Sequence, residues 1–100
     1  MYDMKSLDKF KRYADLAPEA FKAFVAFDEA VIRHGVMPVK YKELIAVAVA
    51  LTTQCPYCIE LHSGRAKKAG ATEQEVAETA LIAAALRAGG SMTHGTHALE

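Results

Sequence analysis

Residues 42–62 read KELIAVAVALTTQCPYCIELH, an almost unbroken apolar run followed by two cysteines spaced C-x-x-C. The run at 44–51 is apolar nearly all round a helix, which predicts a central helix that is buried on every side. Pro56 follows the first cysteine and suits the first turn of a new helix, where its missing N–H costs nothing. The sequence therefore predicts two helices joined by a short turn, with the C-x-x-C pair opening the second helix.

The flanking sequence is dominated by helix signals, and no stretch shows the sustained period of two that is typical of a strand. Gly35 and the Gly89-Gly90 pair are expected to end helices, and the T-x-x-E sequence at 72–75 is a capping box that begins one. The expected helices cover residues 7–16, 18–34, 39 or 40 to 52, 56–69 and 73–88, with a further short helical stretch within 91–99. We therefore predict an all-α fold of about five or six helices, in a single domain over residues 1–100.

Charge and hydropathy exclude two classes of function, nucleic-acid binding and membrane insertion. Twelve basic and twelve acidic residues give a formal net charge of zero, so the chain lacks the positive field of a nucleic-acid binder. The longest apolar run, residues 44–51, is much shorter than the about 20 residues that span a bilayer, and the first residues lack the pattern of a secretory signal. We expect a soluble, cytoplasmic protein without nucleic-acid or membrane partners.

The hydrophobic content is high for so short a chain. Of its 100 residues 52% are hydrophobic, whereas a domain of this size buries only roughly 60 to 65% of the surface that its unfolded chain exposes. An aromatic stripe at Phe21, Phe24 and Phe27 is expected to lie in a core or in an interface. The apolar surplus predicts that this protein associates with a partner surface.

The two cysteines and a histidine form one stripe of the predicted helix. Cys58 lies three residues after Cys55 and four before His62, and residues at these spacings meet on a helix surface. A helix N-terminus stabilises a thiolate, and a histidine one turn away can accept the thiol proton. The helix terminus alone favours Cys55 as the attacking thiol, whereas the base favours Cys58. We expect Cys58 to attack and Cys55 to resolve, because only the base can also return a proton to a leaving group.

Glu43 is a carboxylate at the entry to the most apolar helix. If this helix is buried, an unpaired glutamate would cost several kcal/mol, so the side chain must be partnered or protonated. A histidine one helix away is the obvious partner. The sequence therefore predicts a group of Glu43, His62 and Cys58.

These residues resemble a known signature. Glu43, the C-P-Y-C sequence at 55–58 and His62 match E-x11-C-x-[HY]-C-x3-H, the pattern of the alkylhydroperoxidase D-like branch of the carboxymuconolactone decarboxylase family, and the resemblance covers about residues 41–97. It implies an all-helical homotrimer or homohexamer that reduces hydroperoxides at the expense of a thiol reductant, either dihydrolipoyl, thioredoxin-like or a small thiol. By this resemblance Cys58 is the peroxidatic cysteine, Cys55 resolves it as a disulfide, and Glu43 and His62 relay protons.

The sequence fits that pattern but departs from the best-known members of the branch. Tyr57 stands where some members have a histidine that joins the relay, and its hydroxyl is a possible auxiliary group. His94 and His97 are further auxiliary candidates, since a C-terminal tail can cover a neighbouring subunit's site. The decarboxylases that name the family lack the cysteine pair, which disfavours lactone decarboxylation here. We predict neither a cofactor nor a bound metal.

Two alternatives remain open from the residues alone. Zinc could be held by both cysteines and two of the three histidines at 62, 94 and 97, which would make the chain a zinc-stabilised helical binding module without turnover. The cysteines could also serve a thiol redox sensor that does not turn over rapidly.

Overall fold

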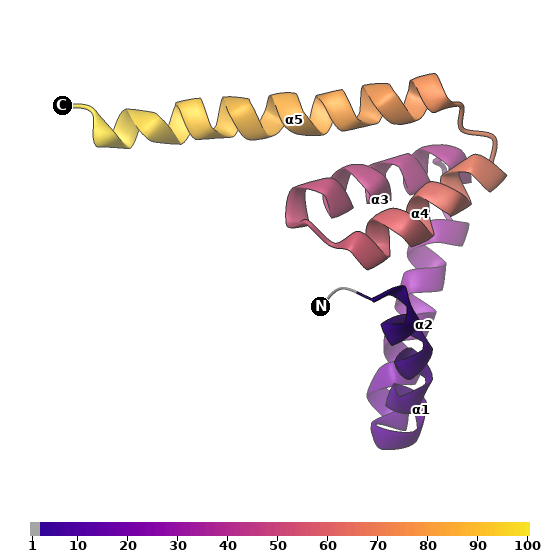
Figure 1. The fold of residues 1–100 in the computed structure, drawn as a ribbon. Helices are drawn as coiled ribbons and strands as arrows, with labels where there is room; N and C mark the ends of the chain where they lie inside the picture. Colours follow the sequence, from indigo (N-terminus) through magenta and orange to yellow (C-terminus); the bar gives the residue numbers. More distant parts are fainter. Residues whose placement is uncertain (1–2) are drawn as a thin grey trace. The chain divides into compact units, whose positions relative to one another are not determined.

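The computed structural model describes residues 3–100, and these residues contain helices and turns without any strand. Figure 1 shows the helices in chain order. They are the 3₁₀ helix η1 (Met4–Lys11), α1 (Arg12–Leu16), α2 (Pro18–Arg33), α3 (Val39–Thr53), α4 (Pro56–Lys68), α5 (Glu73–Gly95) and the 3₁₀ helix η2 (Thr96–Ala98). The predicted all-α fold is confirmed. No helix in the described part of the chain is long and apolar enough to cross a membrane.

The chain separates into two compact units, residues 1–39 and residues 40–100, which are described one at a time. In the first unit, Pro18 occupies the start of α2 as expected, and Gly35 has a φ of 111°. The rings of Phe10, Tyr13 and Phe21 pack with centroid distances of 5.4 to 5.9 Å. The prediction of one domain over the whole chain stays a prediction.

The second unit is built on a helical hairpin. α3 and α4 are connected by a two-residue turn, and α5 then runs alongside α3 in the same direction (Figure 1). Side chains join α5 to both ends of α3: Lys40 pairs with Glu75 at the start, and Arg87 donates to the carbonyl of Thr52 at the end. The buried apolar side chains of the chain's described part lie in this unit, at Leu44, Val47, Ala50, Ala66 and Ala83.

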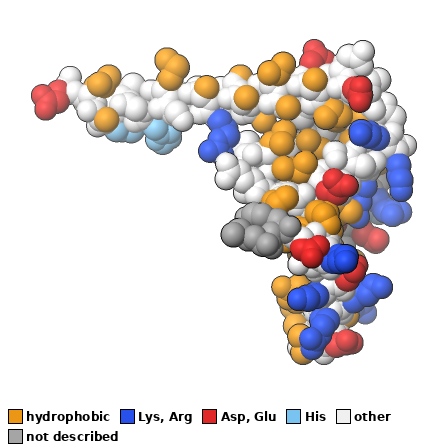
Figure 2. All heavy atoms as spheres, in the orientation of Figure 1, with side chains coloured by type: hydrophobic (Ala, Val, Ile, Leu, Met, Phe, Trp, Pro, Cys, Tyr) orange, Lys and Arg blue, Asp and Glu red, His pale blue; other side chains and the backbone are white. Residues whose placement is uncertain are grey.

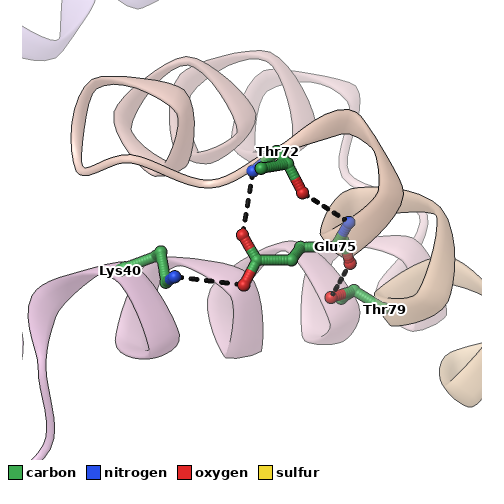
Figure 3. A network of polar contacts seen from close by, with 4 residues as sticks. All are labelled: Lys40, Thr72, Glu75 and Thr79. Carbon is green, nitrogen blue, oxygen red and sulfur yellow. Dashed lines mark hydrogen bonds and ion pairs between the residues drawn. The ribbon is translucent and has the colours of Figure 1, made fainter.

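The N-terminal ends of α3 and α5 are held by one polar network (Figure 3). Thr72 and Glu75 form the predicted capping box, and Lys40 approaches the other oxygen of Glu75 at 3.1 Å. The backbone N–H of Thr72, together with Lys40, lowers the pKa of Glu75 below its ordinary value. The hydrogen bond to Glu75 raises the pKa of Lys40. Thr79, one turn later in α5, donates a hydrogen bond from its hydroxyl to the backbone carbonyl of Glu75.

The expectation that α3 is buried on every side is wrong for the single chain. Glu43, Leu44, Val47 and Ala50 are buried, but Ile45 and Val49 are 50% and 54% exposed. The buried positions repeat every three or four residues, so they form one face of the helix. The remaining surface of α3 is also apolar, but other residues of the single chain do not cover it.

The expected helix end at Gly89-Gly90 is also wrong, because α5 continues to Gly95. Glycine costs a helix interior about 1 kcal/mol relative to alanine, which weakens a helix without forbidding it. Neither glycine has a φ in the left-handed region that would end a helix. The stretch at 91–99, expected as a separate short helix, is the last part of α5 followed by η2.

Candidate active site

Glu43 and His62 are in direct contact. Glu43 lies in the second turn of α3 with 2% of its surface exposed, and its Oε1 is 2.7 Å from Nδ1 of His62 on α4. The His62 side chain is 17% exposed. The structure therefore contains the pairing of glutamate and histidine that burial of the α3 residue required.

This contact orients the imidazole ring. A carboxylate only accepts hydrogen bonds, so Nδ1–H of His62 donates to Glu43 and the lone pair is left on Nε2. The opposite nitrogen is then the basic one, as it is in catalytic triads that place a carboxylate behind a histidine. The arrangement can take up a proton at Nε2 and stabilise the resulting imidazolium.

Cys55 and Cys58 form a disulfide at the N-terminus of α4, with their Cα atoms 5.3 Å apart. Cys55 is the N-cap residue, and its Sγ accepts a hydrogen bond of 3.3 Å from the backbone N–H of Cys58. Pro56 occupies the first helical position. The prediction that the C-x-x-C pair opens a helix is confirmed.

The turn before the disulfide is a Schellman-type helix end. The backbone N–H of Cys55 donates to the carbonyl of Ala50 at 3.1 Å, which is the bond that closes such a turn. Gln54, with a φ of 56°, takes the left-handed position that glycine usually occupies. Cys55 therefore belongs to the end of α3 and to the beginning of α4 at once.

The helix geometry places Cys58 and His62 on one face of α4. They are four residues apart within a continuous helix, whereas Cys55 precedes that helix by one residue. Both cysteines are partly buried. A disulfide, a histidine and a buried carboxylate are thus carried by two adjacent helices, a combination that suits thiol chemistry with proton transfer.

The auxiliary candidates fall in different places. Tyr57 is partly buried in the first turn of α4. His94 and His97 contact each other at the C-terminal end of α5 and in η2, with ring centroids 5.9 Å apart, and both are exposed. Within residues 3–100, no group of three or more His, Cys, Asp or Glu side chains is arranged to hold a metal ion. The four-ligand zinc set is not assembled here, where the two cysteines bond to each other.

Two residues at the end of α3, Gln54 and the Arg87 that contacts Thr52, were missed by reasoning from sequence. Arg87 is an isolated cation on an alanine-rich helix, and nothing in its spacing indicates that it contacts α3. Gln54 could have been suspected only because it directly follows a helix and precedes Cys55. Both depend on tertiary contacts or backbone angles that sequence patterns do not show.

A comparison with protein families supplies the identification. Residues 18–100 match the profile of the carboxymuconolactone decarboxylase family. The chain belongs to this family. The match includes α2 and every helix of the second unit, so it covers the Glu43–His62 contact and the disulfide.

Relatives of the chain agree with that assignment. A Paracoccus denitrificans protein named uncharacterized protein 4 in cox locus is 44% identical over 77% of this chain and 69% of its own length. A crystal structure of a Methanobacterium thermoautotrophicum protein superposes with a TM-score of 0.82 at 35% identity, covering 88% of this chain and 99% of that one. The apo crystal structure of a carboxymuconolactone decarboxylase family protein from Legionella pneumophila superposes with a TM-score of 0.77 at 33% identity. This match covers 93% of this chain and 83% of that one.

Proposed function

We propose that this family member is a thiol-dependent peroxidase of the alkylhydroperoxidase D-like type, which reduces hydroperoxides through Cys58 and Cys55. The observation that carries the proposal is the disulfide at the start of α4 on the same two helices as the Glu43–His62 hydrogen bond. The family's lactone decarboxylases resemble this chain less well in its site, because they lack the cysteine pair. The substrate, the thiol reductant, a homo-oligomeric state and a cytoplasmic location are parts of the same proposal.

The first chemical step begins from the reduced pair. Nε2 of His62 takes the thiol proton of Cys58, and the thiolate sulfur attacks one oxygen of the hydroperoxide. The O–O bond breaks, a sulfenic acid forms on Cys58, and the leaving oxygen departs as an alcohol with the proton that His62 returns. Glu43 holds the ring in the tautomer that this exchange needs and stabilises its charged form.

The second step produces the disulfide. The Cys55 sulfur attacks the Cys58 sulfur, the new S–S bond replaces the S–O bond, and the hydroxyl leaves as water. The product is the Cys55–Cys58 disulfide of this structure. A dithiol reductant then returns the pair to the reduced state by thiol–disulfide exchange and is itself oxidised to a disulfide.

The roles of the two cysteines rest on their positions. Cys55 is the N-cap of α4, where the helix terminus alone would favour its thiolate. Cys58 shares a helix face with His62, and peroxide cleavage requires a proton donor as well as a thiolate. The need for that proton assigns the attack to Cys58.

Intact-mass analysis after one equivalent of hydroperoxide tests the proposal. We expect the reduced chain to lose two hydrogen atoms as the disulfide forms. Cys55→Ser should stop at a sulfenic acid on Cys58 that a dimedone-type reagent traps, whereas Cys58→Ser should be inert. A reduced protein that stays unoxidised by several hydroperoxides is not a peroxidase, and a sulfenic acid formed on Cys55 at the parent rate would reverse the two roles.

A further inference from the structure

We propose that Arg87 is a positioning residue for the redox pair, which acts from α5 by holding the turn that carries Cys55. Its Nη1 donates a hydrogen bond of 2.5 Å to the carbonyl of Thr52, 35 residues earlier in the chain. Thr52 lies in the last turn of α3, three residues before Cys55. The proposal extends the proposed function from the cysteines to a residue of another helix.

The carbonyl that Arg87 binds is one that the helix itself leaves open. The last four carbonyls of an α-helix have no partner within the helix, and a cation near them also interacts favourably with the negative end of the helix dipole. In α3, the Ala50 carbonyl is taken by the N–H of Cys55, and the Val49 carbonyl accepts from the hydroxyls of two threonines, Thr52 and Thr53. Arg87 takes the Thr52 carbonyl, a second of the open carbonyls at the end of α3 after that of Ala50.

This turn needs external support because of Gln54. A residue with a side chain in the left-handed region pays about 1 to 2 kcal/mol that glycine does not pay. Such a conformation persists only when its surroundings hold it. In the disulfide form the covalent bond helps to hold it, but in the dithiol form the noncovalent contacts of the turn must do so alone.

The consequence is a coupling between Arg87 and the redox state. The disulfide forms readily when the turn keeps the Cys55 thiol next to Cys58, and less readily when the turn relaxes and the two thiols separate. Arg87 therefore favours the disulfide over the dithiol. By linkage, formation of the disulfide strengthens the Arg87 contact by the same factor.

A matched control exists at the other end of α3. Lys40 and Glu75 also join α3 to α5 across 35 residues, but they lie at the helix start, far along the chain from Cys55. Arg87→Met and Lys40→Met both keep an unbranched side chain and each remove one link between these helices. Only the first acts on the cysteine turn.

The test is the equilibrium between disulfide and dithiol. Each variant is incubated without oxygen in a series of ratios of reduced to oxidised dithiothreitol, quenched with an alkylating reagent and analysed by intact mass. In this exchange the protein disulfide gains two electrons and two protons, and dithiothreitol loses them. We expect Arg87→Met to shift the equilibrium constant about 3- to 10-fold toward the dithiol, the size of one modest hydrogen bond. Tenfold corresponds to about 30 mV.

The variants separate positioning from general stability. Lys40→Met should stay within about twofold of the parent equilibrium even where it lowers the melting temperature as much, and Arg87→Lys, which keeps a cation, should fall between parent and Arg87→Met. Equal equilibrium constants for the parent and both arginine variants would overturn the proposal, as would equal shifts in Arg87→Met and Lys40→Met. If Arg87→Met does not fold, the comparison of Arg87→Lys with Lys40→Met decides. Because no peroxide is used, failure of the peroxidase proposal leaves this measurement intact.

Discussion

Glu43 shows how one buried side chain can be assigned a role before any substrate is known. It is 2% exposed on a helix that is apolar from Leu44 to Leu51, and its contact with His62 joins two helices. Burying a carboxylate is costly unless a hydrogen-bonding partner compensates. If packing were the only role of this position, an apolar residue could fill it without the cost of burying a carboxylate. The presence of Glu43 therefore favours a chemical role.

Replacement of Glu43 by glutamine separates these roles. Glutamine keeps the shape and one oxygen acceptor for His62, so the fold and the ability to form the disulfide should survive. The reaction with hydroperoxide should slow by about 10² to 10⁴, the usual size of a general acid–base contribution, and its pH dependence should move. Stopped-flow kinetics across the pH range measure both. An unchanged rate accompanied by a lower melting temperature would make Glu43 a structural residue.

Individual residues also show how much of the candidate site could be predicted from the sequence. The Glu43–His62 contact was predictable, because a carboxylate in an apolar helix demands a partner and few candidates are near. The order C-x-x-C followed by His62 was readable from helix spacing alone. Arg87 and Gln54 were not, since a long-range contact and a left-handed backbone angle leave no periodic trace in the sequence.

At the scale of the helix, capping signals were more reliable than glycines. The box at Thr72 and Glu75 begins α5 as predicted because it satisfies two specific backbone N–H groups. Gly89-Gly90 does not end α5, because glycine permits a left-handed ending without imposing one. The all-round apolar pattern of α3 located the helix that carries most of the buried positions among the described residues, but it could not tell how many faces of the helix one chain covers.

The ion pair between α3 and α5 predicts a pH dependence of stability. The folded-state pKa of Glu75 is lowered from 4.5, first by the Thr72 N–H and then by Lys40, so its contribution is present above pH 4.5 and is lost as the pH falls through the folded value. The folded-state pKa of Lys40 is raised from 10.5 by Glu75, so its contribution is present below pH 10.5 and is lost at higher pH. Stability from this pair should therefore form a plateau between these limits.

Urea unfolding of the parent and of Glu75→Gln checks that plateau. Glutamine can still accept the hydrogen bond from the Thr72 backbone but cannot pair with a charged lysine. The difference in unfolding midpoint should be largest near neutral pH and should shrink below pH 4.5 and above pH 10.5. Both side chains are about one quarter exposed, so the effect is expected to be small and to weaken further in high salt. A midpoint difference that is constant across the pH range contradicts this account.

For the whole molecule, the dominant feature is apolar surface that one chain does not cover. Figure 2 shows hydrophobic side chains along α5 and over the helices beside it. On α5 the exposed large residues are Leu81, Ile82, Leu86 and Met92, and on α3 they include Ile45 and Val49. The aromatic stripe of α2 is exposed as well at Phe24 and Phe27. Exposed apolar patches on soluble proteins often mark interaction sites, so the uncovered side chains of α3 and α5 favour association with another surface.

We therefore expect the chain to assemble as a homotrimer or homohexamer, as its resemblance to the alkylhydroperoxidase D-like branch also implies. Light scattering at micromolar concentration should return three or six times the chain mass of 10.8 kDa.

Leu86→Glu would place a charge on the exposed apolar side of α5 and should lower the measured mass, because an unpaired charge is costly to bury in an interface. Lys67→Glu alters an exposed polar position on α4 and serves as the control that leaves the mass unchanged. A parent protein with the mass of a single chain would show that this apolar surface stays exposed in a monomer. An equal change in mass for both variants would show that the interface does not lie on α5.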